Sequence, residues 1–161
     1  DKQRVFAEVV RAAHYVFERS VQAEGVVDHL GQRLLLFEEY PTEPASHVLN
    51  GHIFALLGLH DFACWSNEPR DRFLVAQGLQ TCREGWKHWD VGFWTRYDLH
   101  PSNRLASCMY QRVHVRQMFL LARLFKETVL LNTAHRWQRM LRHPWYRVRW
   151  LVAKFKERAR S

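Results

Sequence analysis

The sequence predicts an all-α fold of antiparallel helical hairpins, and three observations support this class. Apolar residues recur at three- and four-residue steps along most of the 161 residues, as they do on the buried face of a helix. Prolines and glycines divide this pattern into five or six helices with short connections, which favours antiparallel pairs. One short segment changes to an extended pattern and predicts a β-hairpin element at the rim of the helices.

The first predicted helix runs to about Gln22, where a glycine soon follows. Its apolar face is formed by Val5, Phe6, Val9, Val10, Ala13, Val16 and Phe17. The pattern changes period in residues 25–40, where two short extended runs separated by turn-forming residues predict a short hairpin or extended pair. This hairpin leads into the acidic and phenolic residues 38–40, and because prolines follow, we expect their side chains on a rim outside any helix.

Ser46 is the expected N-cap of a second helix that closes near Asp61. A third helix follows Pro69, and residues 92–97 are expected to form a brief extended piece. Two further helices have apolar faces, the first with Val115, Met118, Phe119, Ala122 and Phe125, and the second with Val129, Leu130, Thr133, Ala134, Trp137 and Leu141. Pro144 then separates a last helix from the rest.

Positive charge is concentrated at the C-terminal end of the chain. Of the 24 Lys and Arg residues, seven lie in residues 142–161 against the single acid Glu157, which leaves 17 bases and 15 acids in residues 1–141. We therefore divide the chain into a nearly neutral domain, residues 1–141, and a basic amphipathic C-terminal helix, residues 142–161. Because the body lacks a basic stripe, nucleic acid is not an expected partner.

Three histidines, His47, His52 and His60, are candidate metal ligands. Gaps of five and eight residues place them poorly on one helical face, so no metal site is expected, and no cofactor either. No apolar run approaches the roughly 20 residues that a membrane-spanning helix needs.

Several short motifs occur in order along residues 12–141. They are Glu38-Glu39-Tyr40-Pro41-Thr42, Val48-Leu49-Asn50-Gly51, Tyr97-Asp98-Leu99 and Tyr110-Gln111-Arg112-Val113-His114. These motifs resemble the E-E-Y-P-T, V-L-N-G, Y-D-L and Y-H-x-x-H stretches of the C-terminal domain of D-glucuronyl C5-epimerases. The resemblance implies that the predicted hairpins form part of an (α/α) toroid. It also implies an isomerase that converts D-glucuronate to L-iduronate in a heparosan-like polysaccharide, as in heparan sulfate biosynthesis.

Inverting C5 of a uronate requires two proton-transfer groups, because the proton leaves one face of the ring and returns to the other. Glu39 is the predicted base, which partial burial would strengthen, and Tyr110 is the predicted acid. The other candidates would donate hydrogen bonds to the substrate carboxylate as charge develops there. The predicted catalytic residues are Glu39, Tyr40, Tyr97 and Tyr110, and the predicted substrate-binding residues are Glu38, Asn50, His100 and His114.

Two positions depart from the family pattern. His100 stands where the family has an arginine after Y-D-L, so a titratable imidazole replaces a permanent guanidinium that would hold the substrate carboxylate. Gln111 replaces the first histidine of Y-H-x-x-H. Both changes bear on which uronate the chain accepts.

Two other functions remain as alternatives. A uronan lyase begins with the same C5 proton abstraction and then expels the C4 substituent, which leaves a product that absorbs ultraviolet light. A non-catalytic module would bind an anionic glycan or a membrane surface without exchange at C5, and its binding would depend steeply on salt.

The expected partners include an anionic uronate-containing polysaccharide and a second copy of the chain. Three hairpins make about half of a ring of six, so their unpartnered faces are expected to self-associate, as in a homodimer. In the last helix, the apolar side chains are expected to pack on the body while the charges are solvated. The alternative is that residues 145–161 rest on an anionic membrane surface, beside a membrane-bound polysaccharide synthase.

Overall fold

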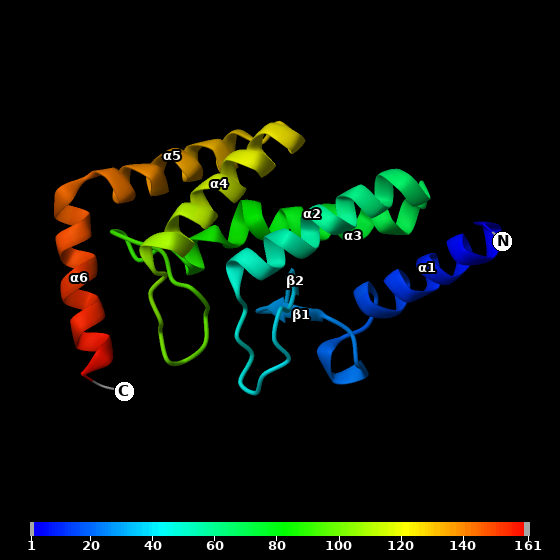
Figure 1. Cartoon of the computed structure of the whole chain (residues 1–161), viewed down its shortest axis with the longest axis horizontal. Coiled ribbons are helices and arrows are strands. Elements are labelled where there is room, and N and C mark those ends of the chain that lie inside the picture. The colour runs from blue at the N-terminus through cyan, green and yellow to red at the C-terminus, as the bar shows by residue number, and fades with distance from the viewer. Residues whose placement is uncertain (1, 160–161) are drawn as a thin grey trace.

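The computed structural model describes residues 2–159 and confirms the mostly α-helical class (Figure 1). The helices are α1 (Lys2–Phe17), α2 (Leu49–Ser66), α3 (Pro69–Gly85), α4 (Cys108–Phe125), α5 (Thr128–Arg142) and α6 (Pro144–Arg158), with 3₁₀ turns η1 (Val21–Ala23) and η2 (Trp86–His88). Strands β1 (Val27–Leu30) and β2 (Leu34–Phe37) form the predicted antiparallel hairpin, in which Val27 pairs with Phe37 and Leu30 with Leu34.

Two helical hairpins form the body of the fold. Helix α2 packs along α3 and helix α4 along α5, and α2 also contacts α4. Asn67 and Lys126 end α2 and α4 in the left-handed conformation, with φ of 59° and 56°, so the chain reverses within a few residues. Pro69 at the start of α3 suits this geometry because the first helical N–H needs no partner. Closure of the hairpins into a toroid stays a prediction.

The apolar core lies between β2 and helices α2 to α5. Its largest fully buried side chains include Phe37, Ile53, Leu56, Trp89, Trp94, Met118, Leu130 and Trp137. Two of these tryptophans anchor the long connection between η2 and α4. The indole N–H of Trp89 donates to the carbonyl of His47 (3.0 Å), and that of Trp94 donates to the carbonyl of Ala106 (2.9 Å). This connection carries Tyr97, so its anchoring fixes part of the candidate site.

Four predicted boundaries differ from the structure. The first helix ends at Phe17, short of the expected residue, and residues 92–97 take part only in isolated bridges. Helix α2 continues to Ser66, beyond Asp61. Its N-cap is Val48, two residues beyond the expected Ser46, whose hydroxyl donates to the Glu38 carboxylate.

Candidate active site

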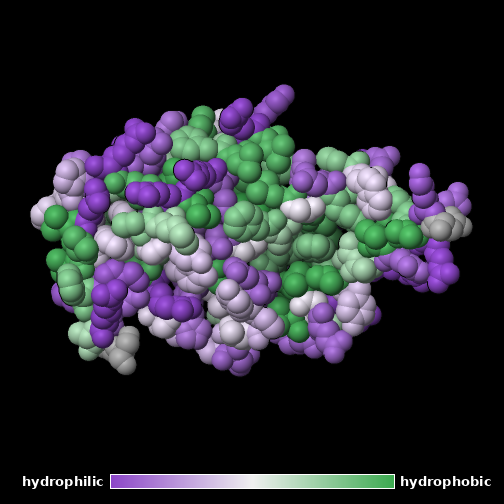
Figure 2. Space-filling model, viewed as in Figure 1, coloured by the Kyte–Doolittle hydropathy of each residue, from purple (hydrophilic) through white to green (hydrophobic). Residues whose placement is uncertain are grey.

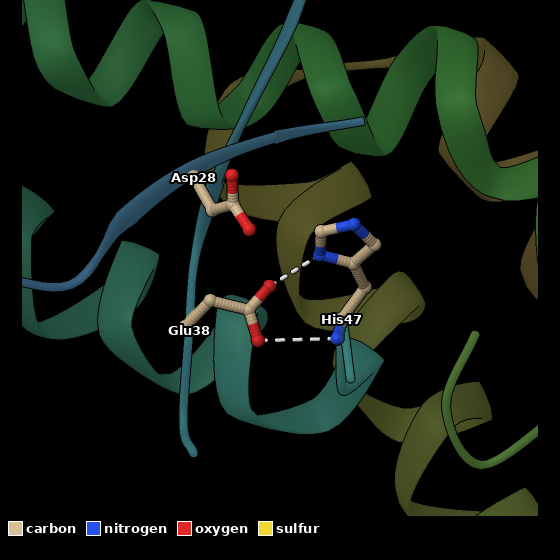
Figure 3. A group of neighbouring side chains, drawn as sticks. All are labelled: Asp28, Glu38 and His47. Atoms are coloured by element: carbon tan, nitrogen blue, oxygen red, sulfur yellow. Dashed lines mark hydrogen bonds and ion pairs between the residues drawn. The ribbon is translucent and has the colours of Figure 1, made fainter. Parts of the chain in front are cut away.

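Glu38 and Glu39 follow β2 and lie on opposite sides of the chain, as neighbours in an extended segment do. The buried Glu38 carboxylate accepts from the His47 backbone N–H (3.1 Å) and the Ser46 hydroxyl (3.3 Å), and it pairs with the His47 ring (Figure 3). The expected rim position is therefore wrong for Glu38, whose carboxylate holds the segment before α2. Glu39 lies on the rim and is exposed, so the partial burial expected for it is absent in this chain.

The three predicted phenols meet beside Glu39. The rings of Tyr97 and Tyr110 lie 4.6 Å apart between centroids, with an angle of 64° between their planes. Tyr40, half exposed, interacts with both Glu39 and Tyr97. The structure thus brings together all four predicted catalytic residues from the end of β2, the connection before α4 and the first turn of α4.

Backbone contacts hold these three segments in place. The Ser107 hydroxyl caps α4 by accepting the Tyr110 backbone N–H (3.2 Å). The Tyr97 N–H donates to the carbonyl of Arg104 (2.9 Å), and the Leu99 N–H donates to the carbonyl of Ser46 (2.8 Å). The connection that carries Tyr97 is therefore tied to the loop that follows Tyr40.

Two of the phenols, those of Tyr40 and Tyr97, are held in their neutral form. Hydrogen bonding to the Glu39 carboxylate, and the negative charge of that carboxylate, raise the pKa of Tyr40. Burial, together with hydrogen bonding to Tyr110, raises the pKa of Tyr97. Both groups are therefore hydrogen-bond donors at neutral pH.

His114 is buried, one helical turn after the partly buried Tyr110 in α4. Its Nδ1 is 2.9 Å from the Thr95 hydroxyl, and burial lowers the pKa of the ring to about 3, so the imidazole is neutral. The buried Gln111 side chain accepts from the Thr95 N–H (2.9 Å) and the Thr95 hydroxyl (2.5 Å). His114 and Gln111 thus form a polar network beneath the site, and contact of His114 with substrate stays a prediction.

Asn50 is also buried, at the start of α2. Its backbone carbonyl accepts from the Gln117 amide (3.0 Å). Within the described residues, Asn50 Oδ1, Gln117 Oε1 and His114 Nε2 are buried without a hydrogen-bond partner. Such atoms are costly to leave unpaired, so they mark positions where a bound polar group would be stabilised.

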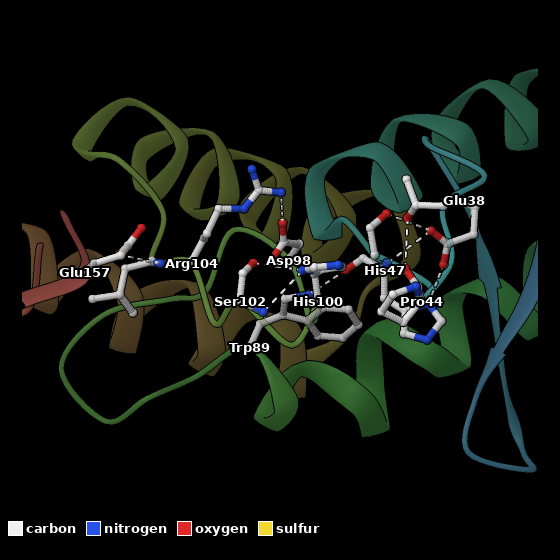
Figure 4. Close-up of polar contacts among 12 residues, drawn as sticks. Glu38, Pro44, His47, Trp89, Asp98, His100, Ser102, Arg104 and Glu157 are labelled. Carbon is white, nitrogen blue, oxygen red and sulfur yellow. Dashed lines mark hydrogen bonds and ion pairs between the residues drawn. The ribbon is translucent and has the colours of Figure 1, made fainter. Parts of the chain in front are cut away.

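His100 lies in a tight turn of its own. Its Nδ1 is 2.9 Å from the Ser102 hydroxyl and accepts the Ser102 N–H (3.2 Å) (Figure 4). A guanidinium that the motifs did not reveal lies beside one phenol: Arg104 pairs with the buried Asp98, and its guanidinium carbon is 5.5 Å from the centre of the Tyr97 ring. The residue pattern does not single out Arg104. Its contact with the Tyr97 ring arises only because the chain turns between these two residues.

Among the residues that the structure describes, one group of side chains could hold a metal ion. Asp28, Glu38 and His47 offer ligand atoms that all lie within 4.8 Å of one another, and Figure 3 shows Asp28 facing the paired Glu38 and His47. Two carboxylates and one imidazole suit a divalent transition metal. The Glu38 charge is, however, matched by His47, whose pKa is raised by hydrogen bonding to Glu38. The spacing of the three histidines could not reveal this group, because two of its three members are carboxylates.

Comparison with known proteins connects this surface to a family. The family model described as the C-terminus of D-glucuronyl C5-epimerase matches residues 2–139. A D-glucuronyl C5-epimerase of Caenorhabditis elegans is 33% identical over 118 residues, which cover 63% of this chain and 19% of that protein. An uncharacterised protein of Methanocaldococcus jannaschii is 29% identical over 104 residues, covering 63% of this chain and 32% of that protein.

The chain thus spans less than a third of the length of these relatives. The family match nevertheless covers every segment that carries Glu39, Tyr40, Tyr97 and Tyr110. The chain belongs to the family of D-glucuronyl C5-epimerase C-terminal domains.

Proposed function

We propose that this chain supplies the catalytic surface of an epimerase that converts D-glucuronate to L-iduronate residues in a heparosan-like polysaccharide. The observation that carries the proposal is that the exposed Glu39 lies beside the partly buried rings of Tyr97 and Tyr110, whose centroids are 4.6 Å apart. A carboxylate and a phenol are the two proton-transfer groups that an inversion at C5 requires.

In this mechanism, Glu39 removes the C5 proton and the electron pair of the C–H bond moves into the substrate carboxylate, which becomes an enediolate. Tyr110 then donates its proton to C5 from the opposite face, and proton exchange with water restores the glutamate and the phenol. A polymer bound over the site would exclude water from Glu39, which would strengthen it as a base.

The remaining groups stabilise the enediolate charge. Tyr40 and Tyr97 donate hydrogen bonds, because their raised pKa values keep both phenols protonated. Arg104 takes the role of the arginine that the family has at position 100, since about half of its side chain is exposed and it lies over the Tyr97 ring.

The test is uptake of deuterium at C5 of heparosan oligosaccharides by the full-length protein. Glu39→Gln and Tyr110→Phe should each slow the exchange about 10²-fold or more. Glu43→Gln and Tyr15→Phe are matched controls, because Glu43 is exposed on the loop after the site and Tyr15 bonds to Glu24 on the N-terminal segment. Either control should exchange like the wild type. The proposal would be contradicted if the wild-type protein caused no deuterium exchange at C5. It would also be contradicted by an ultraviolet-absorbing product, which is typical of a lyase.

A further inference from the structure

Helix α6 is attached to the body by one face only. The ring of Trp150 stacks on Trp94 at 5.3 Å, and its indole N–H donates to the carbonyl of Ala106 (3.0 Å). On the same face, Glu157 accepts the Leu105 N–H (3.3 Å). These contacts fix the orientation of α6 and therefore determine which of its side chains face outward.

The outward face is apolar. The α6 stripe consists of Trp145, Val148, Leu151, Val152 and Phe155, which are 62%, 50%, 47%, 50% and 69% exposed. Three- and four-residue steps place these residues on one side of the helix, away from Trp150. In Figure 2 hydrophobic residues lie along part of the outer edge where Figure 1 places α6, next to hydrophilic ones. The expectation that the apolar side chains of this helix pack on the body is confirmed for Trp150 and is wrong for the five residues of the α6 stripe, which are exposed.

Positive charge borders the α6 stripe on both sides. The helical period places Arg147 and Arg158 along one edge, and Arg149 and Lys156 along the other. Within residues 2–159, Arg147, Arg158 and Lys156 have no carboxylate partner, whereas Lys154 pairs with Glu157 at 2.8 Å. A second copy of α6 would bring these like charges together, whereas an anionic surface would neutralise them.

A basic pocket adjoins one edge of the α6 stripe. It encloses about 350 Å³ between α4, α5 and α6, and Arg112, Arg116, Arg142 and Arg147 line it without any carboxylate. Guanidinium groups bind phosphate oxygens through paired hydrogen bonds, so four of them around one pocket suit a phosphate headgroup. Arg147 belongs to both the pocket and the stripe edge, which links the two features.

We propose that α6 binds flat on an anionic phospholipid membrane, with the α6 stripe among the acyl chains and the flanking bases on the headgroups. The 15 residues of α6 extend for about 22 Å, and a helix of this type lies in the interface plane. None of the described helices is long and apolar enough to cross a bilayer. Helix α6 also lies beyond residues 2–139, so the stripe is not part of the matched family domain.

Flotation of the full-length protein with vesicles tests this proposal. Vesicles of phosphatidylcholine with about one-fifth phosphatidylserine should carry the wild type at low salt, and pure phosphatidylcholine vesicles should carry much less. Binding should weaken at about 1 M salt, where the Debye length falls to about 3 Å. Deleting α6 is a poor test, because it would also remove Trp150 from the body.

Surface substitutions avoid that problem. Val148→Ser with Phe155→Ser should abolish flotation, whereas Phe73→Ser, a 62% exposed phenylalanine on α3, should not. Arg147→Gln and Lys156→Gln should each weaken binding about fivefold, which is about 1 kcal/mol per base. The matched control Arg11→Gln, on the exposed face of α1, should have no effect.

Three results would overturn the proposal. The first is that the wild type does not float with vesicles that contain phosphatidylserine. The second is that Phe73→Ser reduces flotation as much as the α6 double variant does. The double variant could also convert a dimer into a monomer in sedimentation while leaving flotation unchanged, which would make a second copy the occupant of the stripe.

Discussion

Gly51 lies directly beneath the Glu39 side chain. A Cβ at position 51 would approach Glu39 Oε2 to 2.5 Å and Glu39 Cβ to 2.6 Å, so only a glycine leaves the carboxylate in its observed place. Gly51→Ala should therefore displace Glu39 and reduce deuterium exchange at C5 about tenfold or more, because proton transfer depends on position. Exchange kinetics with heparosan oligosaccharides would measure the loss.

Gly58 is the matched control in the same helix. A Cβ at position 58 meets nothing within 4 Å, so Gly58→Ala should leave exchange unchanged and stabilise the fold by about 0.5–1 kcal/mol. Equal activity of the two alanine variants would mean that the contact between Gly51 and Glu39 does not position the carboxylate.

The Thr95 hydroxyl joins Gln111 and His114 in the buried network beneath the site. Thr95→Val should lower the free energy of unfolding by about 1–3 kcal/mol, because it leaves the buried His114 Nδ1 without a partner and removes one of the two Thr95 hydrogen bonds to Gln111. Thr133→Val is the comparison, since the buried Thr133 hydroxyl bonds only to the carbonyl of Val129 in its own helix. Chemical denaturation should show a clearly smaller loss for Thr133→Val, and equal losses would contradict the network.

Stability should fall on mild acidification. Burial lowers the pKa of His52 to about 4 and that of His114 to about 3, whereas an unfolded histidine ionises near 6.5. Below about pH 6.5 the unfolded state therefore binds more protons, and the stability present above that pH is progressively lost as the pH falls. Each histidine contributes a slope of about 1.4 kcal/mol per pH unit.

Denaturation midpoints at pH 7, 6 and 5 would measure this effect. The His52 ring accepts the Phe37 N–H (3.1 Å) and its Nε2 lies 3.0 Å from the carbonyl of Gly78, a pairing that requires the neutral form. His29, on the β-hairpin, is exposed, so His29→Gln should leave the profile unchanged. A stability that is flat from pH 7 to pH 5 would contradict the burial of neutral histidines.

Arg104 should bind the substrate carboxylate. Arg104→Gln is expected to reduce kcat/KM for the uronate polymer about tenfold or more, because it removes the guanidinium over Tyr97. Arg96→Gln is the control, since Arg96 bonds to Asn103 on the same connection. If His100→Ala causes the larger loss, the carboxylate is held at position 100, as the motif alone suggested.

The residue pattern was enough to predict local structure. Apolar steps of three and four residues located the helices, and the change of period at residues 25–40 located the hairpin, because each depends on neighbours along the chain. The predicted N-cap at Ser46 was wrong, because the Glu38 carboxylate binds Ser46 and His47 ahead of the helix, and that contact lies outside the local pattern. The motif resemblance selected Glu39, Tyr40, Tyr97 and Tyr110, but it could not place them relative to one another.

Tertiary packing decided which polar residues face the site. The sequence by itself determined the helices, the hairpin, the family and the candidate catalytic residues, since these depend on local periods and ordered motifs. Only the tertiary structure decided that Glu38 points inward to His47 and that Arg104 lies over Tyr97. It also decided that Trp150 packs against Trp94, which leaves the α6 stripe facing outward. These outcomes depend on contacts between segments distant in sequence, which no local pattern encodes.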